Sequence, residues 1–357
     1  MTFQPSWDVE LAQVARAEQP APARVAVVIP CYRASASLGA VVSAIGREVW
    51  RIYCIDDASP DRTIEAIEAA AELDPRVRLI RRTENGGVGA AVVDGIRAAL
   101  DDGAQIIVKI DSDGQMNPAF IPEFIAPIAS GEGDYVKGNR FFALDRVVKM
   151  PPLRLAGNAG LSFLAKLSTG YWDVFDPTNG YVAIHAEVAR LLPLERLHRR
   201  YFFESDLLFR LSTLRARVVE LPLETVYQDE ESHLSELRCL ATFPLLHGRN
   251  FFKRLFYNYV LRNFSTASLS LIGGLMMLAF GIVFGGLHWL DSLRTGEPAT
   301  AGTVMLSALP LLVSIQLLLN FLSQDVALTP STAIHRRLGS KRVLTTTISD
   351  LSAKDHP

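Results

Sequence analysis

The sequence has little cysteine and no excess of charge of either sign. Its 357 residues include three cysteines, Cys31, Cys54 and Cys239, and no C-x-x-C pair. This argues against a zinc site or a disulfide framework and favours reduced, structural thiols in a cytosolic compartment. Lys and Arg total 36 while Asp and Glu total 38, so the net charge is −2. A nearly neutral chain has no overall basic field, so nucleic acid is not expected as a partner.

Common nucleotide-binding motifs and a signal peptide are also missing. No G-x-x-x-x-G-K-[ST] occurs, and the glycine-rich turn at 85–89 is not G-x-G-x-x-G, so P-loop and dinucleotide sites lose support. Residues 1–24 have no basic region followed by an apolar core. We expect this segment to be an extension, with a short helix near 8–17 and a linker, rather than a secretory signal.

Charged side chains are absent from two long stretches near the C-terminus. Residues 263–290 and 299–324 contain no Asp, Glu, Lys or Arg. Each stretch exceeds the roughly 20 residues that cross a bilayer as a helix, which predicts membrane-spanning helices near 267–290 and 303–322. A buried hairpin of a soluble domain would need a larger covering shell than the chain supplies.

The charges around this region, 263–325, predict its orientation. Basic residues precede the first expected helix and follow the second, whereas the intervening loop has one arginine and two acidic residues. Cytoplasmic flanks are rich in Lys and Arg, so the region before the spans, the tail at 326–357 and both termini are expected in the cytoplasm. The chain would be an integral protein of a bacterial inner membrane or its equivalent. Gly281 and Gly285 form a G-x-x-x-G motif, which leaves a homo-oligomer open.

The segment at 236–262 mixes large apolar and aromatic side chains with basic ones. This pattern is typical of amphipathic helices that lie on a membrane surface with their cations near lipid phosphates. A lipid substrate could then enter the protein from the side.

Between residues 25 and 110, apolar runs alternate with helical patterns. Strands are expected at 25–29, 51–55, 77–81 and 105–110, and helices at 37–48, 61–73 and 89–100. Apolar strands in strict alternation with helices predict an α/β fold, a mostly parallel sheet with helices on both faces. Ligands of such sheets bind beyond the carboxyl ends of the strands.

Polar and glycine clusters follow these strands and should share that edge. Asp111 and Asp113 follow the fourth strand, and two carboxylates one residue apart can hold a divalent cation while the chain is extended. Asp57 ends the second strand, and the glycines Gly86 and Gly87 precede a helix, where backbone N–H groups can face a phosphate.

Each cluster also has a simpler structural explanation. A D-x-D sequence is often a solvated turn, and glycines before a helix often supply a positive φ. Asp61 is expected to be the N-cap of the helix that begins near Thr63.

Four segments carry a resemblance to a known family. They are 30–33 (PCYR), 56–63 (DDASPDRT), 85–91 (NGGVGAA) and 111–118 (DSDGQMNP). In order and spacing they resemble the inverting family 2 glycosyltransferases of the Rossmann-like GT-A fold, and within them the polyprenyl-phosphate glycosyltransferases. The resemblance spans residues 25–237 and implies a GT-A catalytic domain at 25–235.

The resemblance implies a nucleotide-sugar donor and Mg²⁺ or Mn²⁺ at this edge. Asp111, Asp113 and Gln115 are the implied metal ligands, and the cation would offset the charge of the leaving diphosphate. The implied donor-binding residues are Pro30, Tyr32, Asp57, Gly86, Gly87, Asp111, Ser112 and Asn179.

The resemblance also extends to the acceptor side. Asp113, Glu204 and Asp206 are the implied catalytic residues, and Arg140 and Arg154 the implied ligands of an acceptor phosphate. The structural alternatives are an acidic pair favoured by a helix N-terminus and arginines that are simply solvated.

The acceptor decides what Glu204 must do. A sugar hydroxyl must lose its proton as it attacks and calls for a general base, whereas a lipid phosphate is already an anion. The expected spans favour a polyprenyl phosphate, undecaprenyl or dolichyl, as acceptor. A membrane-anchored transferase that extends a saccharide is the alternative. A non-catalytic sugar-binding membrane protein is disfavoured because it has no use for Asp111 and Asp113 together.

The stretch at 227–235 departs from the pattern of mannose-transferring relatives, which often carry basic residues there. Here residues 229–231 are acidic, which puts GDP-mannose in doubt and leaves UDP and GDP donors open. A loop that closes over the donor is one role for this stretch.

Overall fold

The computed structural model describes residues 23–142, 152–223 and 236–338, without the side chains at 152–154, 156 and 236–241. The helix expected near 8–17 and the acidic stretch at 229–231 lie outside the described residues.

A seven-stranded sheet in the order β3-β2-β1-β4-β6-β5-β7 forms the core. Its strands are β1 Val25–Cys31, β2 Val49–Asp56, β3 Val77–Arg81, β4 Ile106–Lys109, β5 Tyr135–Asn139, β6 Val182–His185 and β7 Val218–Pro222. Only β6 runs antiparallel to its neighbours, β4 and β5. The remaining pairs are parallel, so the expected mostly parallel α/β sheet is confirmed.

Helices cover both faces of the sheet, as the apolar strands require. One face carries α2 Leu38–Ser43, α3 Thr63–Leu73 and α5 Ile121–Ala129, and the other carries α4 Val88–Asp101, α8 Ala186–Leu191 and α9 Phe203–Leu214. Short 3-10 turns occupy Pro118–Phe120 and Leu194–Arg196. The helix expected at 37–48 was too long, because the chain leaves the helix after Ser43, just ahead of Gly46, a poor helix former.

The N-cap expected at Asp61 is wrong. Arg62 occupies the N-cap position of α3, without a side-chain cap. The Asp61 carboxylate instead accepts the hydroxyls of Thr63, at 2.6 Å, and Ser35, at 2.7 Å. It therefore joins the start of α3 to the loop that follows β1.

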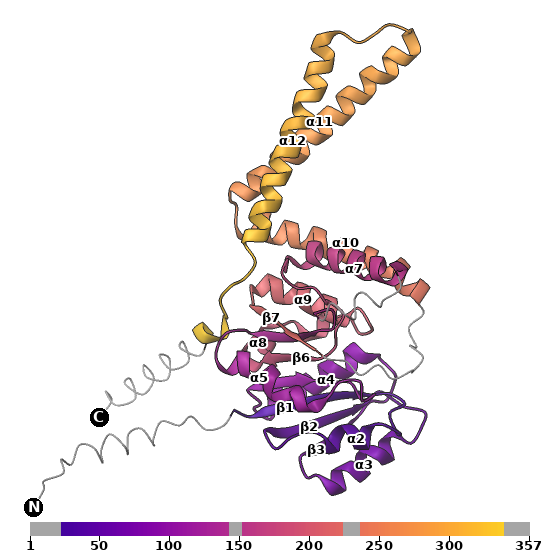
Figure 1. The fold of residues 1–357 in the computed structure, drawn as a ribbon, viewed down its shortest axis with the longest axis vertical. Coiled ribbons are helices and arrows are strands. Elements are labelled where there is room, and N and C mark those ends of the chain that lie inside the picture. Colours follow the sequence, from indigo (N-terminus) through magenta and orange to yellow (C-terminus); the bar gives the residue numbers. More distant parts are fainter. Residues whose placement is uncertain (1–22, 143–151, 224–235, 339–357) are drawn as a thin grey trace, which may run out of the picture.

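Two long helices lie between the sheet and a projecting hairpin (Figure 1). These are α7 Pro152–Thr169 and α10 Glu236–Phe256, which pack side by side. Phe163 of α7 and Phe252 and Phe256 of α10 are exposed. The sequence predicted a helix on the membrane surface in the region of α10. It assigned α7 to the GT-A domain and did not predict that α7 would pack beside α10.

A helical hairpin extends from this layer. A π-helical stretch, Tyr257–Arg262, follows α10 and leads to α11 Thr266–Thr295 and α12 Ala301–Ala327. Both hairpin helices are long and apolar enough to cross a membrane, and their side chains are largely exposed. They match the two spans expected from the sequence, with a few more residues at the ends.

The glycines of the G-x-x-x-G motif are used inside this hairpin. A β-carbon at Gly281 would lie 2.7 Å from Leu311 Cγ, and one at Gly285 would lie 3.2 Å from Ser307 Cβ. The motif therefore brings α11 close to α12 of the same chain. A homo-oligomer remains a prediction that this motif no longer supports.

The hairpin is tied to the rest of the protein by several contacts, and two of them involve buried aspartates. At the first, Asp325 of α12 binds Arg254 of α10 through two contacts of 2.6 and 3.0 Å. At the second, the chain beyond α12 returns to the sheet, where the buried Asp134 accepts the backbone N–H groups of Ile334 at 2.8 Å and His335 at 2.9 Å. These contacts fix the hairpin relative to the sheet.

Candidate active site

A buried lysine joins the two groups of carboxylates that the sequence had indicated. Lys109, the last residue of β4, is 3% exposed. Its Nζ lies 2.6 Å from Asp111 Oδ1 and 3.7 Å from Glu204 Oε1. Asp111 follows β4 and Glu204 lies in the first turn of α9, so one cation connects the strand edge to α9.

Burial acts in opposite directions on the pKa values of Lys109 and Glu204. Burial alone would lower the pKa of Lys109, but the carboxylates of Asp111 and Glu204 outweigh it and raise that pKa. Lys109 is therefore a stable ammonium group. Burial raises the pKa of Glu204, although Lys109 opposes this effect. The lysine thus helps to hold a carboxylate at a place that would otherwise favour its neutral form.

Glycine at position 180 lets the backbone approach this pair. A β-carbon there would collide with Lys109 Nζ and lie 3.0 Å from Asp111 Oδ2. The turn that contains Gly180 therefore forms one wall beside Asp111.

Asp113 and its neighbours form a tight turn after β4. Asp113 Oδ1 accepts the N–H of Gln115 at 2.9 Å, and Gly114 between them has a φ of +80°. The Ser112 carbonyl accepts the hydroxyl of Ser37 at 2.6 Å, which joins this turn to the loop before α2.

This turn suits a hard divalent cation that arrives with its substrate. Asp111 and Asp113 supply carboxylate oxygens, and the Asp111 side chain is 30% exposed. Among the described residues, no group of three or more His, Cys, Asp or Glu side chains could hold a metal without further ligands. Mg²⁺ is commonly held by one or two carboxylates together with substrate phosphates, so the donor set fits such an ion.

Asp57 organises the glycine-rich turn. Its carboxylate accepts the N–H groups of Gly86 at 2.9 Å and Gly87 at 2.8 Å, and it also binds Arg82 Nη1 at 2.6 Å. The two N–H groups expected to face a phosphate therefore bind the carboxylate of the residue that follows β2. Donor contact by Asp57, Gly86 and Gly87 stays a prediction.

The same turn packs against the loop that leads into α9. Gly87 has a φ of +91°, and a β-carbon there would lie 2.8 Å from the Arg199 carbonyl oxygen. Ala90 donates its N–H to that oxygen at 3.1 Å. A β-carbon at Gly89 would collide with the His198 carbonyl oxygen. The glycines therefore permit close packing between this turn and the loop that leads into α9.

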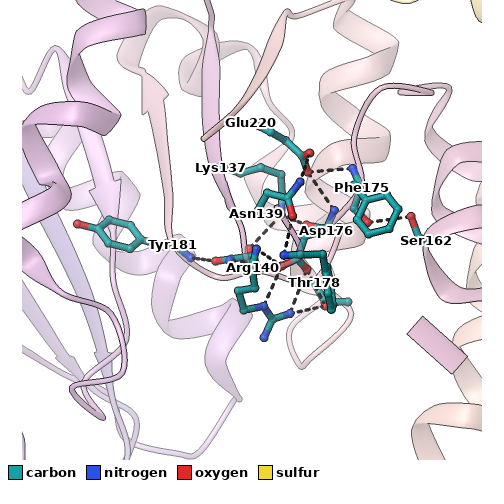
Figure 2. Close-up of polar contacts among 11 residues, drawn as sticks. Lys137, Asn139, Arg140, Ser162, Phe175, Asp176, Thr178, Tyr181 and Glu220 are labelled. Carbon is teal, nitrogen blue, oxygen red and sulfur yellow. Dashed lines mark hydrogen bonds and ion pairs between the residues drawn. The ribbon is translucent and has the colours of Figure 1, made fainter. Parts of the chain in front are cut away.

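A network of polar side chains surrounds Asp176 (Figure 2). Arg140 Nε and Nη2 bind the two Asp176 carboxylate oxygens at 2.8 and 3.0 Å, and Nη2 also reaches Thr178 Oγ1 at 3.2 Å. Burial would raise the pKa of Asp176, but the hydrogen bonds and charge of Arg140 lower it. The ion pair offsets the charge that Arg140 would present to an acceptor phosphate, so that role stays a prediction.

Lys137 and Glu220 belong to this network, and neither had been selected as a site residue. Lys137 is fully buried and donates to the carbonyl oxygens of Asp176 and Asn179. Glu220 of β7 accepts the N–H of Asp176 at 3.0 Å and the side-chain amide of Asn139 at 2.9 Å. A lysine inside an apolar strand was the available signal, because a buried ammonium group needs polar partners.

Asp206 connects α9 to the membrane-side helix α10. Its carboxylate accepts the His198 N–H at 3.0 Å, Arg210 Nε at 3.1 Å and Asn250 Nδ2 at 3.2 Å. These contacts link α9 to the loop before it and to α10. A catalytic role for Asp206 stays a prediction.

The other predicted site residues occupy varied positions. Pro30 is buried within β1, and Tyr32 just beyond it is 47% exposed. Asn179 is buried, and its side chain accepts the Tyr181 N–H at 2.8 Å. Arg154 falls in the first turn of α7, where the side chains lie outside the described residues.

Several known proteins are similar to this chain in sequence. Glycosyl transferase family 2 matches residues 26–192. An undecaprenyl-phosphate mannosyltransferase of Micrococcus luteus is 30% identical over 209 residues, which cover 58% of this chain and 85% of that protein. A UDP-N-acetylglucosamine–dolichyl-phosphate N-acetylglucosaminyltransferase of Methanococcus voltae is 28% identical over 216 residues, covering 57% of this chain and 86% of that protein.

Among solved structures, glucosyl-3-phosphoglycerate synthase of Mycobacterium tuberculosis with Mn²⁺, UDP and phosphoglyceric acid is 21% identical. The similarity covers 71% of this chain and 84% of that one, with a TM-score of 0.49. The sequence matches, together with the paired carboxylates after β4, place the chain in its family. It belongs to glycosyltransferase family 2, within the polyprenyl-phosphate glycosyltransferase subgroup.

Proposed function

We propose that this protein transfers a sugar from a nucleotide-sugar to a polyprenyl phosphate at the cytoplasmic face of a membrane. One continuous set of contacts carries the proposal. Asp111 contacts Lys109, Lys109 lies beside Glu204 of α9, and Asp206 of the same helix binds Asn250 of α10. The donor edge is therefore only one helix away from the layer that supports the hairpin.

The reaction needs little proton transfer from the protein. An oxygen of the lipid phosphate attacks the anomeric carbon, the bond to the nucleoside diphosphate breaks, and inversion gives the polyprenyl-phosphate sugar. The attacking phosphate is already ionised near neutral pH, so no general base is required. The diphosphate departs with the electron pair of the broken bond.

Asp111 and Asp113, with Gln115, would hold Mg²⁺ or Mn²⁺ against the donor diphosphate. Such an ion stabilises the negative charge that builds on the leaving group. Asp57 and the glycine turn shape the donor side, with Pro30, Tyr32, Ser112 and Asn179 as further candidate contacts. Arg140 and Arg154 are the candidate ligands of the acceptor phosphate.

We also propose that the sheet domain and both termini face the cytoplasm. Arg249, Lys253, Arg254 and Arg262 precede α11, and Arg336 and Arg337 follow α12, whereas Arg294 is the lone arginine of the connecting region. This distribution follows the positive-inside rule. Cysteine-accessibility labelling in sealed vesicles, with single cysteines at 298 and 101, tests the orientation.

The transfer test uses purified protein, a panel of labelled nucleotide-sugars and Mg²⁺, with and without undecaprenyl phosphate. We expect one label to move into the organic phase only when the lipid phosphate is present. Equal release of nucleoside diphosphate with and without the lipid would overturn the proposal. The label that moves identifies the sugar and the donor nucleotide.

Glu204→Gln separates this reaction from extension of a saccharide. For a phosphate acceptor we expect the initial rate to fall by less than about tenfold, because no proton has to be removed. For a sugar hydroxyl, loss of a general base should cost roughly 10²–10⁴-fold. Asp101→Ala, at the exposed end of α4, is the control for a carboxylate outside the site.

A further inference from the structure

A cavity of about 130 Å³, lined mainly by residues with polar side chains, lies where the hairpin meets the sheet domain. The end of α7, the end of α9, the π-helical stretch and the facing ends of α11 and α12 all contribute to its wall. It is distinct from the candidate active site. Glu204 and Ser212 lie near opposite ends of α9, and the eight-residue separation corresponds to about 12 Å along the helix axis.

The lining of this cavity has an excess of positive charge. Its charged residues are Arg215, Arg254, Arg262 and Asp325. Asp325 is paired with Arg254. Arg215 donates to the Leu328 carbonyl at 3.1 Å and Arg262 to the Thr213 carbonyl at 2.5 Å. The partners of Arg215 and Arg262 are therefore uncharged carbonyl groups. Asp325 offsets the charge of Arg254, so the positive charges of Arg215 and Arg262 are left without a carboxylate in the lining.

Other features of the wall favour an anion that carries a hydrogen-bond donor. Ser265, the N-cap of the long helix α11, lines the cavity, and a helix N-terminus favours negative charge. Asn258 also lines the cavity. Its side-chain oxygen is buried and has no hydrogen-bond partner among the described residues. A headgroup hydroxyl or a bridging water would satisfy that oxygen.

The surroundings indicate how the anion arrives. Leu261 and Phe264, in the segment that connects α10 to α11, are 64% and 65% exposed. They stand beside the cavity at the base of two helices long enough to cross a membrane. An amphiphile with its polar group in the cavity could lay its chains against these side chains and α11.

We propose that this cavity binds the phosphate group of an anionic phospholipid from the membrane leaflet in which the hairpin is anchored. Arginine recognises phosphate through paired, charge-assisted hydrogen bonds, and Arg215 and Arg262 supply that chemistry here. The bound lipid would tie the π-helical stretch and α12 to the end of α9. This proposal concerns binding and stands independently of the transfer reaction.

Asn258→Asp is the sharpest test, because it adds a negative charge with almost no change in shape. The full-length protein is placed in nanodiscs of phosphatidylcholine, with or without an equal amount of phosphatidylglycerol, and retained lipids are counted by native mass spectrometry. We expect the wild type to retain phosphatidylglycerol selectively. The variant should bind it about tenfold more weakly, because the added carboxylate repels the phosphate and competes with it for the cavity arginines.

Arg215→Gln and Arg262→Gln should weaken retention by a similar factor, and Arg262→Lys should restore part of it. Arg294→Gln removes the same charge at the far end of the hairpin and should leave retention unchanged. The melting temperature of each variant is measured in nanodiscs with and without phosphatidylglycerol. A variant that is generally less stable has a lower melting temperature than the wild type in both kinds of nanodisc.

A second arm adds inorganic phosphate to protein in phosphatidylcholine nanodiscs. We expect little change in melting temperature, because the lipid chains contribute to binding. Stabilisation by phosphate equal to that by phosphatidylglycerol would overturn the assignment to a lipid. Equal retention of phosphatidylglycerol by the wild type and Asn258→Asp would overturn the site itself.

Discussion

Two ion pairs, one in the candidate active site and one at the base of the hairpin, differ in how far their carboxylates are exposed. Asp111 pairs with Lys109 at the donor edge, and its side chain is 30% exposed. Asp325 pairs with Arg254 at the membrane junction, and its side chain is 3% exposed. Asp325 also accepts hydrogen bonds from Tyr259 and, at 2.9 Å, from Trp172.

The difference separates a carboxylate that can receive a ligand from one that joins elements of the fold. Asp111 has one strong protein partner and remains open toward solvent, as a metal ligand must. Asp325 accepts hydrogen bonds from α10, the π-helical stretch and the loop after α7, so its oxygens are already used by the protein. Substitutions on the two sides should therefore affect different measurements.

On the donor side, Asp113→Ala should give the largest effect. We expect kcat/KM for the nucleotide-sugar to fall about a thousandfold, because the loss of a metal ligand removes several kcal/mol of charge stabilisation. The melting temperature without ligands should change little. Asp101→Ala is the matched control, and an active Asp113→Ala protein would show that the turn after β4 does not bind the cation.

On the membrane side, Asp325→Ala should chiefly reduce stability. The substitution leaves the buried Arg254 guanidinium without its carboxylate, which typically costs about 3–5 kcal/mol. We expect the melting temperature in detergent to fall by about 10 °C or more. Glu297→Ala, an exposed carboxylate in the connection between α11 and α12, should leave it unchanged. A stable Asp325→Ala protein would mean that the junction does not depend on this pair.

The donor side was largely predictable because its signals are local in the sequence. Strand β3 has the expected limits, and Asp57, Asp111 and Asp113 follow strands directly, so periodicity and strand order were enough to place them on one edge. What local patterns did not reveal is that Asp57 binds the glycine turn 29 and 30 residues away.

The acceptor and membrane side was less predictable because its contacts are distant in sequence. Arg140 and Asp176 are 36 residues apart, Asn139 and Glu220 are 81, and Arg254 and Asp325 are 71. No repeating pattern links such pairs. Lys109 and Lys137 lie in apolar strands, and a charged side chain buried there needs polar partners, but the sequence does not say which residues these are.

Gly180→Ala tests whether the donor carboxylate needs its close backbone wall. The new β-carbon would displace Lys109 Nζ, which is held by Asp111 and Glu204 and has little freedom to move. We expect about a tenfold loss in kcat/KM, equal to about 1.4 kcal/mol, with a higher KM for the donor. Gly39→Ala in α2, where nothing lies within 4 Å, should stabilise the protein by about 0.5–1 kcal/mol.

The smallest effect concerns the second attachment of the hairpin, where His335 stacks on His185 at 4.2 Å. Burial, assisted by the charge of His335, lowers the pKa of His185 to about 4. The unfolded chain, with an ordinary histidine pKa of about 6.5, then binds more protons between these values, so stability should fall as the pH drops through this window.

His185→Asn removes that titration and keeps the helix cap, because His185 Nδ1 accepts the Glu187 N–H at the start of α8 and asparagine caps well. We expect the melting temperature of the variant to depend less on pH between about 6.5 and 4 than that of the wild type. Parallel curves for the two proteins would mean that His185 is not held neutral by the returning chain. The hydrogen bonds from Ile334 and His335 to Asp134 would then account for this second attachment without a contribution from the neutral state of His185.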